Sequence, residues 1–201
     1  MLPKLLLATN NQGKVREYRQ LLRDLPYELI TSAEQGITGV VAETGRTLED
    51  NARLKATVLA GESQLTTLAD DSGLEVDALG GEPGPLSARY AGEGASDEER
   101  ISYLLARLEG VPWERRSARF RCVIALATPE GQVELCCGEC HGYITFKPRG
   151  KQGFGYDPIF YFPEMDKTMA ELPPELKNQV SHRGQAARQV RQKLEMLTGT
   201  K

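Results

Sequence analysis

The sequence has no long apolar segment. The first apolar run, within PKLLLATNN near the start, is far shorter than the roughly 20 residues that a membrane-spanning helix needs. It is also too short for the apolar region of a secretory signal. No internal repeat, low-complexity tract or obvious interdomain linker is present. The pattern therefore predicts neither membrane insertion nor secretion.

The sequence also lacks a strong charge of either sign. The net charge is −3, the isoelectric point is near 5.6, and 40% of the 201 residues are hydrophobic, enough for a real core. Without a broad basic field, binding to nucleic acid or to a membrane surface is not expected. We expect a cytoplasmic protein with one large domain or one domain of two lobes.

Cysteine is scarce, and its spacing does not complete a zinc motif. Cys136, Cys137 and Cys140 cluster beside His141, and Cys122 stands alone upstream. A tetrahedral zinc site would need a second paired motif, which the sequence does not contain. The cysteines are interpreted as structural thiols along a strand of a reduced protein.

Apolar periodicity predicts an α/β fold. We expect strands at 3–9, 27–32, 65–71 and 73–76, with a long hairpin formed by 117–128 and 132–146. Helices are predicted from residue 12 onward, at 47–61, from Ser96 to Leu108, and at 183–197. Thr47 is the expected N-cap of the second helix and Gly61 its end, whereas Ser96 and Glu99 form a capping box.

The stretch DDSGLEV, residues 70–76, has two interpretations. Asp, Ser and Gly are common turn residues, and Gly73 could supply a positive φ, so the motif alone favours a surface turn. However, Asp70 and Asp71 repel each other unless a cation lies beside them. The alternative is therefore a carboxylate pair that holds a divalent metal.

Three cations occupy unusual positions. Lys55 falls on the apolar arc of its helix, Arg183 lies on the apolar side of the last helix, and Lys14 begins the first helix. A single inward lysine is usually explained by its charged end reaching back to solvent. Three such cations from three helices indicate a shared anionic partner.

Two glycine-containing segments are weak phosphate signals by themselves. ATNNQGK places a buried strand, a turn and a helix N-terminus in succession, which suits phosphate binding, but it is not a Walker loop. GFGYD, residues 153–157, is not a dinucleotide fingerprint, although Phe154 and Tyr156 could stack on a base. With the cations and the carboxylate pair, these segments predict a polyphosphate and Mg²⁺, with one carboxylate activating water.

Five segments together resemble the inosine triphosphate pyrophosphatase family, which acts on deaminated, non-standard purine nucleoside triphosphates. They are ATNNQGKVRE, ETGRTLEDNARLKA, ADDSGLEVDALGGEPGPLSARYAG, QGFGYDPIF and SHRGQA, in the family's order over nearly the whole chain. The resemblance implies that residues 1–201 are a single α/β domain, with a long mixed sheet and two lobes around an active-site cleft. It also implies a homodimer.

The activity implied by this resemblance is Mg²⁺-dependent hydrolysis of ITP, dITP and XTP to the monophosphate and pyrophosphate, which removes deaminated purines from the nucleotide pool. Asp71 would be the general base, assisted by Lys55 at the phosphates. Metal ligands would be Asp71, Glu43 and Glu17, although Ala42 stands where family members often carry another acid, so the second ligand stays open. Substrate would be bound by Thr9, Asn10, Asn11, Gln12, Gly13, Lys14, Ser72, Phe154, Gly155, Tyr156, Asp157, Lys177, His182 and Arg183, the last two reading the base.

Two other functions stay open at this point. A metal-dependent phosphatase of different specificity would release orthophosphate in place of pyrophosphate. A non-catalytic nucleotide-binding or RNA-binding module would not need DDSG, and its binding would depend strongly on salt.

Overall fold

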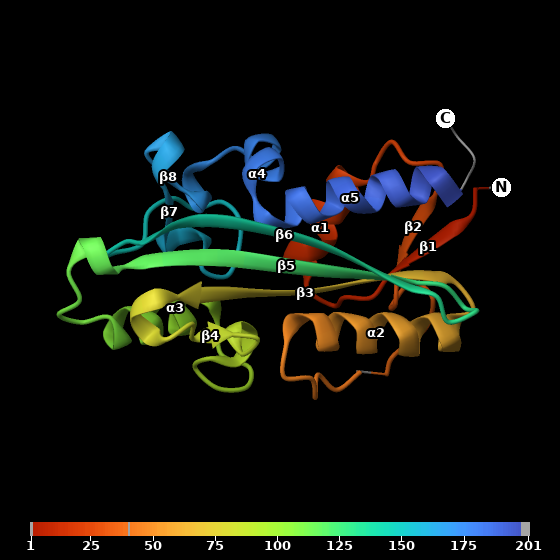
Figure 1. The fold of residues 1–201 in the computed structure, drawn as a ribbon, viewed down its shortest axis with the longest axis horizontal. Coiled ribbons are helices and arrows are strands. Elements are labelled where there is room, and N and C mark those ends of the chain that lie inside the picture. Colours follow the sequence, from red (N-terminus) through yellow and green to blue (C-terminus); the bar gives the residue numbers. More distant parts are fainter. Residues whose placement is uncertain (1, 40, 198–201) are drawn as a thin grey trace. The chain divides into compact units, whose positions relative to one another are not determined.

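The computed structural model describes residues 2–39 and 41–197, and Figure 1 shows its helices and strands. The helices are α1 Gln12–Leu21, α2 Leu48–Ser63, α3 Asp97–Arg107, α4 Pro174–Val180 and α5 His182–Leu197. The strands are β1 Lys4–Leu7, β2 Glu28–Thr31, β3 Thr66–Val76, β4 Pro83–Gly84, β5 Ser117–Ala127, β6 Val133–Ile144, β7 Phe160–Phe162 and β8 Lys167–Thr168.

The described strands form a mixed sheet in the order β2-β1-β3-β5-β6-β7-β8, with β4 beside β3. Strand β1 pairs in parallel with β2 and β3, whereas β4, β7 and β8 pair antiparallel to their neighbours. The predicted α/β class with a mixed sheet is confirmed, as is the hairpin, whose strands β5 and β6 are neighbours joined by the turn at 128–132.

The chain divides into two compact units. The first contains Met1–Asp71, Cys122–Gly138 and Arg183–Lys201, and the second contains Ser72–Arg121 and Glu139–His182. Strands β3, β5 and β6 contribute residues to both units. Because the boundary crosses strands, each unit is assembled from segments that lie far apart in the sequence.

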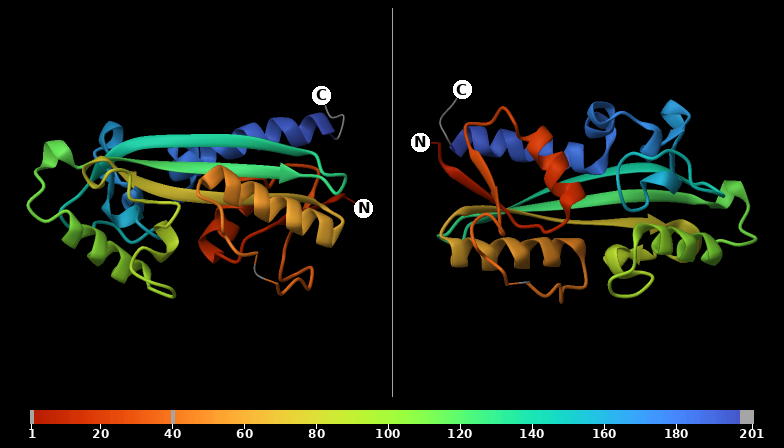
Figure 2. Two further views of the ribbon diagram at one scale, coloured as in Figure 1. Left: turned by 60° about the horizontal axis from the view of Figure 1, so that its bottom comes forward. Right: turned by 180° about the vertical axis from the view of Figure 1, so that it is seen from behind.

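In the first unit, side chains alternate between the two faces of the strands, as the period of two in a strand requires. Leu5 and Leu7 pack with Val15 and Tyr18 of α1 and with α5, whereas Leu6 packs with α2 on the other face. Figure 2 shows α2 on the face of β1 and β3 opposite α1 and α5. The first unit is therefore a three-layer α/β/α structure.

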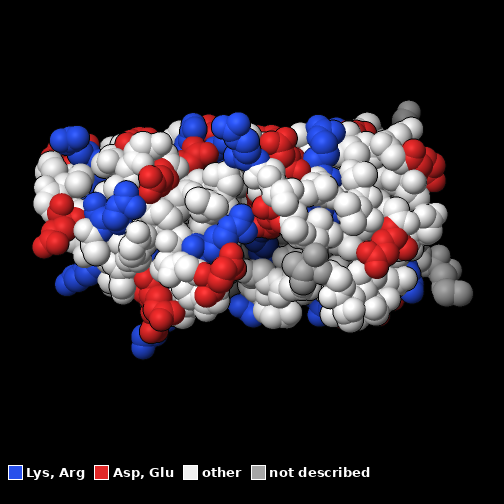
Figure 3. All heavy atoms as spheres, turned by 90° about the horizontal axis from the view of Figure 1, so that it is seen from below, with Lys and Arg blue, Asp and Glu red and all other residues white. Residues whose placement is uncertain are grey.

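The core of the second unit lies among α3, the ends of β3, β5 and β6, and the segment 154–162. Leu74, Leu104, Ile144 and Phe160 are fully buried there. Outside the cores, Figure 3 shows Lys and Arg interspersed with Asp and Glu over one face. Among the described residues, every helix is too short or too polar to cross a bilayer.

The turn interpretation of DDSGLEV is wrong. Residues 70–76 belong to the uninterrupted strand β3, and Gly73 has no positive φ. A Cβ at Gly73 would collide with the carbonyl oxygen of Gly84, while the Leu74 N–H donates to Ser87 Oγ at 2.9 Å. The glycine is therefore required because β4 approaches closely, and a backbone reversal plays no part.

The capping predictions are confirmed at helix starts but not at the end of α2. Thr47 Oγ1 accepts from the Asp50 N–H at 3.1 Å, and Ser96 and Glu99 form the expected capping box. Helix α2 continues through Gly61 to Ser63, and Gln64 takes the left-handed conformation with φ of 55°. Gly61 was therefore the wrong end point.

Candidate functional site

The turn after β1 leads into the N-terminus of α1, as the phosphate-binding interpretation requires. Asn11 caps the helix, its Oδ1 accepting from the Lys14 N–H at 3.0 Å, and Thr9 Oγ1 accepts from the Asn11 N–H at 3.2 Å. The side chains of Asn10, Asn11 and Gln12 are exposed, and Gly13 is buried. The helix N-terminus thus faces solvent across a short polar turn, where an anion can meet free N–H groups.

Asp70 is the centre of a buried cluster in the first unit. Only 1% exposed, it accepts hydrogen bonds from Lys14 Nζ, from Tyr18 Oη at 2.6 Å, from Arg183 Nε at 2.8 Å and from Cys122 Sγ at 3.4 Å. Arg183 in turn donates from Nη1 to Glu17 Oε2 at 2.7 Å. Two of the three inward cations therefore meet on one carboxylate.

The charges in this cluster stabilise one another. Burial alone raises the pKa of Asp70, but the positive charges of Arg183 and Lys14 outweigh it and hold that pKa well below its usual range. Burial lowers the pKa of Arg183, yet Asp70 and Glu17 raise it well above its ordinary value. Burial and the charge of Asp70 raise the pKa of Tyr18. Asp70 is thus ionised and fully engaged.

Lys55, the third inward cation, belongs to α2, which packs on the sheet face opposite α1 and α5. Its Nζ donates to the Asp70 carbonyl oxygen at 2.9 Å and to Glu43 Oε1 at 2.8 Å, and it lies 3.6 Å from Asp71 Oδ1. Burial lowers the pKa of Lys55, but Asp71 and Glu43 outweigh it, so the net shift is upward. Lys55 therefore stays charged and bridges two carboxylates.

Asp71 differs from Asp70 in its surroundings. It is 6% exposed, and its Oδ2 atom is buried without a hydrogen-bond partner. The nearby Asn51 side chain lowers the pKa of Asp71, but less than the two lysines do. Burial raises the pKa of Asp71 more than Lys55 and Lys14 lower it. A buried oxygen without a partner is unfavourable unless a ligand completes it. Asp71 is therefore the carboxylate available for chemistry.

The residues present fit a divalent metal that takes few protein ligands. The Lys55 ammonium contacts both Glu43 and Asp71, so the oxygens of these two carboxylates lie near each other. The Asp71 Oδ2 atom lacks a hydrogen-bond partner. Glu17 is engaged by Arg183. Within the described part of the chain, no three His, Cys, Asp or Glu side chains gather as a metal-binding group. Mg²⁺ commonly uses one or two carboxylates and takes its other ligands from water and phosphate.

The cysteines that the sequence placed near His141 lie along β6. Cys136 and Cys140 are buried, Cys137 is exposed, and all are free thiols. The His141 ring nitrogen lies 3.2 Å from Glu139 on the protein surface. Burial raises the pKa of Cys136 to about 11 and that of Cys140 to about 12, so these two thiols are poor nucleophiles and metal ligands.

In the second unit, residues 153–157 (GFGYD), here called the glycine-rich loop, are organised around a buried ion pair. Asp157 and Lys177 are 3% and 4% exposed and contact each other directly. Asp157 Oδ2 also accepts from the Phe154 N–H at 2.9 Å, and Lys177 Nζ lies 4.9 Å from the centre of the Phe154 ring. The loop therefore presents Phe154, which is only partly buried, on a rigid base.

Tyr156 is placed differently from the expectation. Its ring is 4% exposed within the core, and its hydroxyl donates to the Ser87 carbonyl at 2.9 Å. Such a ring has no free face for a base, so Tyr156 anchors the loop, and of the two rings predicted to stack only Phe154 is partly exposed. Ser72, also expected at the substrate, is half-buried in β3.

The two residues expected to read the base have different environments. His182 is the last residue of the second unit; it stacks on Phe120 with ring centres 4.7 Å apart, and its Nδ1 lies 3.9 Å from Cys140 Sγ. Arg183 begins the last segment of the first unit and is engaged by the acidic cluster described above. Reading of the base by His182 stays a prediction, whereas the bonds of Arg183 to Asp70 and Glu17 favour a role in the acidic cluster.

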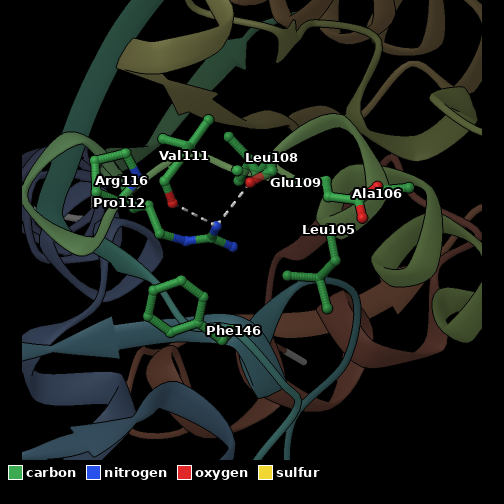
Figure 4. A pocket seen from close by; sticks show the side chains of 9 residues that line it. Leu105, Ala106, Leu108, Glu109, Val111, Pro112, Arg116 and Phe146 are labelled. Carbon is green, nitrogen blue, oxygen red and sulfur yellow. Dashed lines mark hydrogen bonds between the residues drawn. The ribbon is translucent and has the colours of Figure 1, made fainter.

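A cavity in the second unit contains none of the expected site residues. It holds about 480 Å³ and is lined by Leu105, Ala106, Leu108, Glu109, Gly110, Val111, Pro112, Arg116 and Phe146 (Figure 4). The buried Arg116 guanidinium donates to the carbonyls of Leu108, Val111, Ile144 and Thr145. It thereby joins the C-terminal end of α3 to the end of β6, which is a structural role.

Sequence reasoning missed three residues that lie beside the carboxylates. They are Tyr18 of α1, Cys122 of β5 and Asn51 of α2, and the sequence indicated none of them as a site residue. The one available signal was the Tyr18 hydroxyl, because a buried tyrosine usually needs a hydrogen-bond partner. Nothing in the local sequence of Cys122 or Asn51 reveals these contacts.

Comparison with known proteins gives consistent results. A chain from Geobacter sulfurreducens, named dITP/XTP pyrophosphatase, is 52% identical and aligns over 91% of this chain and 92% of its own length. A Bacillus subtilis protein of the same name is 45% identical over 94% and 96% of the two chains.

Solved structures agree. A HAM1 protein from Coxiella burnetii superposes with a TM-score of 0.87 at 45% identity, covering 96% of this chain and 99% of the other. The Staphylococcus aureus Ham1 protein gives a TM-score of 0.85 at 44% identity, covering 98% and 100%. The profile of the Ham1 family matches residues 5–193. The resemblance found in the sequence is thus confirmed, and the chain belongs to the Ham1 family.

Proposed function

We propose that this protein hydrolyses ITP, dITP and XTP to the nucleoside monophosphate and pyrophosphate, with Mg²⁺ as cofactor. The observation that carries the proposal is Asp71, a buried carboxylate with one unpartnered oxygen, which shares the Lys55 ammonium with Glu43. The names of the similar dITP/XTP pyrophosphatases support the same substrates.

The proposed chemistry uses the first unit for the triphosphate. The N–H groups at the start of α1, with Lys14 and Lys55, neutralise phosphate charge, because a helix N-terminus and buried ammonium groups favour anions. Asp71 accepts a proton from the attacking water, which forms a new P–O bond as pyrophosphate leaves.

Asp71 and Glu43 would hold Mg²⁺, with Glu17 as a further proposed ligand; when bound, the ion would neutralise phosphate charge and orient water. In the second unit, Phe154 would stack on the purine. Asp157 and Lys177 would keep its loop in place, and His182 would approach the base.

We also propose that residues 1–201 act as one domain of two lobes, in a cytoplasmic homodimer. Four free thiols support a reducing compartment, and the near-neutral net charge gives no reason to expect a nucleic-acid or membrane partner. Light scattering of the purified protein would test the dimer directly.

The decisive assay incubates the purified protein with Mg²⁺ and a panel of ITP, dITP, XTP, GTP and ATP, and separates both products. We expect monophosphate plus pyrophosphate from the first three, far faster than from ATP, with activity lost to a chelator and restored by Mg²⁺. Release of orthophosphate would instead identify a phosphatase, and binding without turnover would identify a non-catalytic module.

A further inference from the structure

The glycine-rich loop has a second carboxylate anchor outside its own sequence. Asp97, the first residue of α3, accepts the Gly155 N–H on Oδ2 at 2.6 Å. The preceding N–H, that of Phe154, is held by Asp157 at 2.9 Å. Two consecutive backbone amides are therefore each fixed by a different carboxylate, on either side of the proposed stacking ring.

Asp97 is itself held in place. Its Oδ1 pairs with Arg100 one turn later on α3, and the Arg100 side chain is only 17% exposed. The Arg100 guanidinium also donates to the Ala88 carbonyl at 2.9 Å and to the Ala95 carbonyl. Asp97 is thus oriented by an arginine tied to the segment before α3.

The segment before α3 anchors the loop at a further point. Tyr156 donates from its hydroxyl to the Ser87 carbonyl, and Ser87 Oγ in turn holds the Leu74 N–H and the Gly84 carbonyl. The motif GGEPGPLSARYAG, residues 80–92, has no part in the proposed chemistry, yet two of its carbonyls hold these anchors. It therefore forms a scaffold behind the loop.

We propose that Asp97 is a positioning residue for nucleoside binding: through the Gly155 N–H it fixes the loop so that Phe154 is already placed before the base arrives. This inference rests on the proposed function, because Phe154 is taken as the stacking residue. The physical reason is preorganisation, since a loop ordered before binding loses less conformational entropy on binding. Asp97 touches no reacting atom, so its effect falls on nucleoside affinity.

The test compares Asp97→Ala and Asp97→Asn with Glu98→Gln. Glu98 is exposed in the same first turn, so the control removes equal charge from the start of α3 and leaves the loop anchor intact. We expect both Asp97 variants to weaken binding of inosine monophosphate about 10-fold, with kcat for ITP within about 2-fold of wild type. The inhibition constant of tripolyphosphate, which has no base, should not change.

Amide hydrogen exchange of residues 151–157 in the ligand-free protein tests the anchor without any reference to activity. Exchange at Gly155 should become faster in Asp97→Ala and stay unchanged in Glu98→Gln. Unchanged exchange, or unchanged monophosphate binding in an active protein, would overturn the role of Asp97 alone. A wild-type protein that neither cleaves ITP nor binds the monophosphate would overturn the proposed function and, with it, this inference.

Discussion

The carboxylate cluster of the first unit and the loop of the second unit hold their charges in different ways. Asp70 receives two cations, Lys14 and Arg183, together with a tyrosine hydroxyl, and Arg183 also pairs with Glu17, so several opposite charges form one buried network. In the loop, Asp157 and Lys177 form a single buried pair, and the remaining anchors are backbone N–H groups. One region holds several charges in a network, and the other holds an aromatic ring in position through one ion pair and two backbone N–H groups.

Under the proposed function, the first region would meet the phosphates of the substrate and the second region would meet its purine. A polyphosphate needs preformed positive charge, which buried ammonium and guanidinium groups can supply only if a carboxylate holds them in place. A purine is neutral and needs an aromatic face with little motion. Charge substitutions should therefore damage the first region most, whereas loss of a ring or an anchor should damage the second.

The largest expected effect is on stability, at Asp70. Asp70→Asn leaves Arg183 and Lys14 buried beside a neutral amide, and removing one partner of a buried ion pair destabilises a protein by about 3–5 kcal/mol. Urea unfolding at pH 7 would measure this loss. Asp24→Asn is the control, because the Asp24 side chain is 69% exposed in a surface pair and its loss should change little.

The pH dependence gives this prediction a definite sign. The folded-state pKa of Asp70 lies well below that of the unfolded chain, about 3.9, so its stabilisation is present above that value and is lost as the pH falls through the folded pKa. The stability difference between wild type and Asp70→Asn should therefore be constant near neutrality and shrink in acid. A difference that grows in acid would contradict the assignment.

The next largest effect concerns activity, at the neighbouring residue. Asp71→Asn should reduce kcat for ITP by at least about 10²-fold, because a proton acceptor and proposed metal ligand is lost. The folded-state pKa of Asp71 is raised, so the ionised group opposes folding at pH 7, and the amide should match or exceed wild type in stability. Steady-state kinetics and thermal unfolding of one preparation test both, and near-normal kcat would remove Asp71 from the mechanism.

A moderate effect is expected at the stacking ring. Phe154→Ala should raise KM for ITP by roughly 5- to 150-fold, since base–aromatic stacking contributes about 1–3 kcal/mol. Phe146→Ala is a matched control: that ring also lies under a cation, with Arg116 4.5 Å from its centre, yet it is 63% exposed beside the cavity of Figure 4. Equal changes in KM for the two variants would show that Phe154 does not contact the base.

The smallest expected effect is a change in selectivity, at Arg183. Because its Nε and Nη1 donate to Asp70 and Glu17, Arg183→Met should lower kcat/KM for ITP and ATP together. The ratio of the two should change by less than about 3-fold, a small free-energy difference. A collapse of the ratio would instead show that Arg183 reads the base, as the sequence resemblance implied.

The sequence alone determined the features that depend on local pattern. The buried apolar run of β1, the apolar arc of α2 and the caps at Thr47 and Ser96 each involve residues within a few positions of one another, so local pattern and hydrogen-bonding type suffice to predict them. The inward position of Lys55 followed from the same geometry. The five ordered segments also predicted the family before any contact was known.

Only the tertiary structure decided how adjacent aspartates differ. Asp70 meets Arg183 from 113 positions away, whereas Asp71 on the opposite strand face keeps one oxygen unpaired. The Asp97 anchor likewise joins residues 58 positions apart. Local propensity carries no information on such pairs, because burial, desolvation and partner charge depend on segments brought together by folding. The two adjacent aspartates of DDSG therefore differ in role: Asp70 is a buried anchor for Arg183, and Asp71 is the carboxylate available for chemistry.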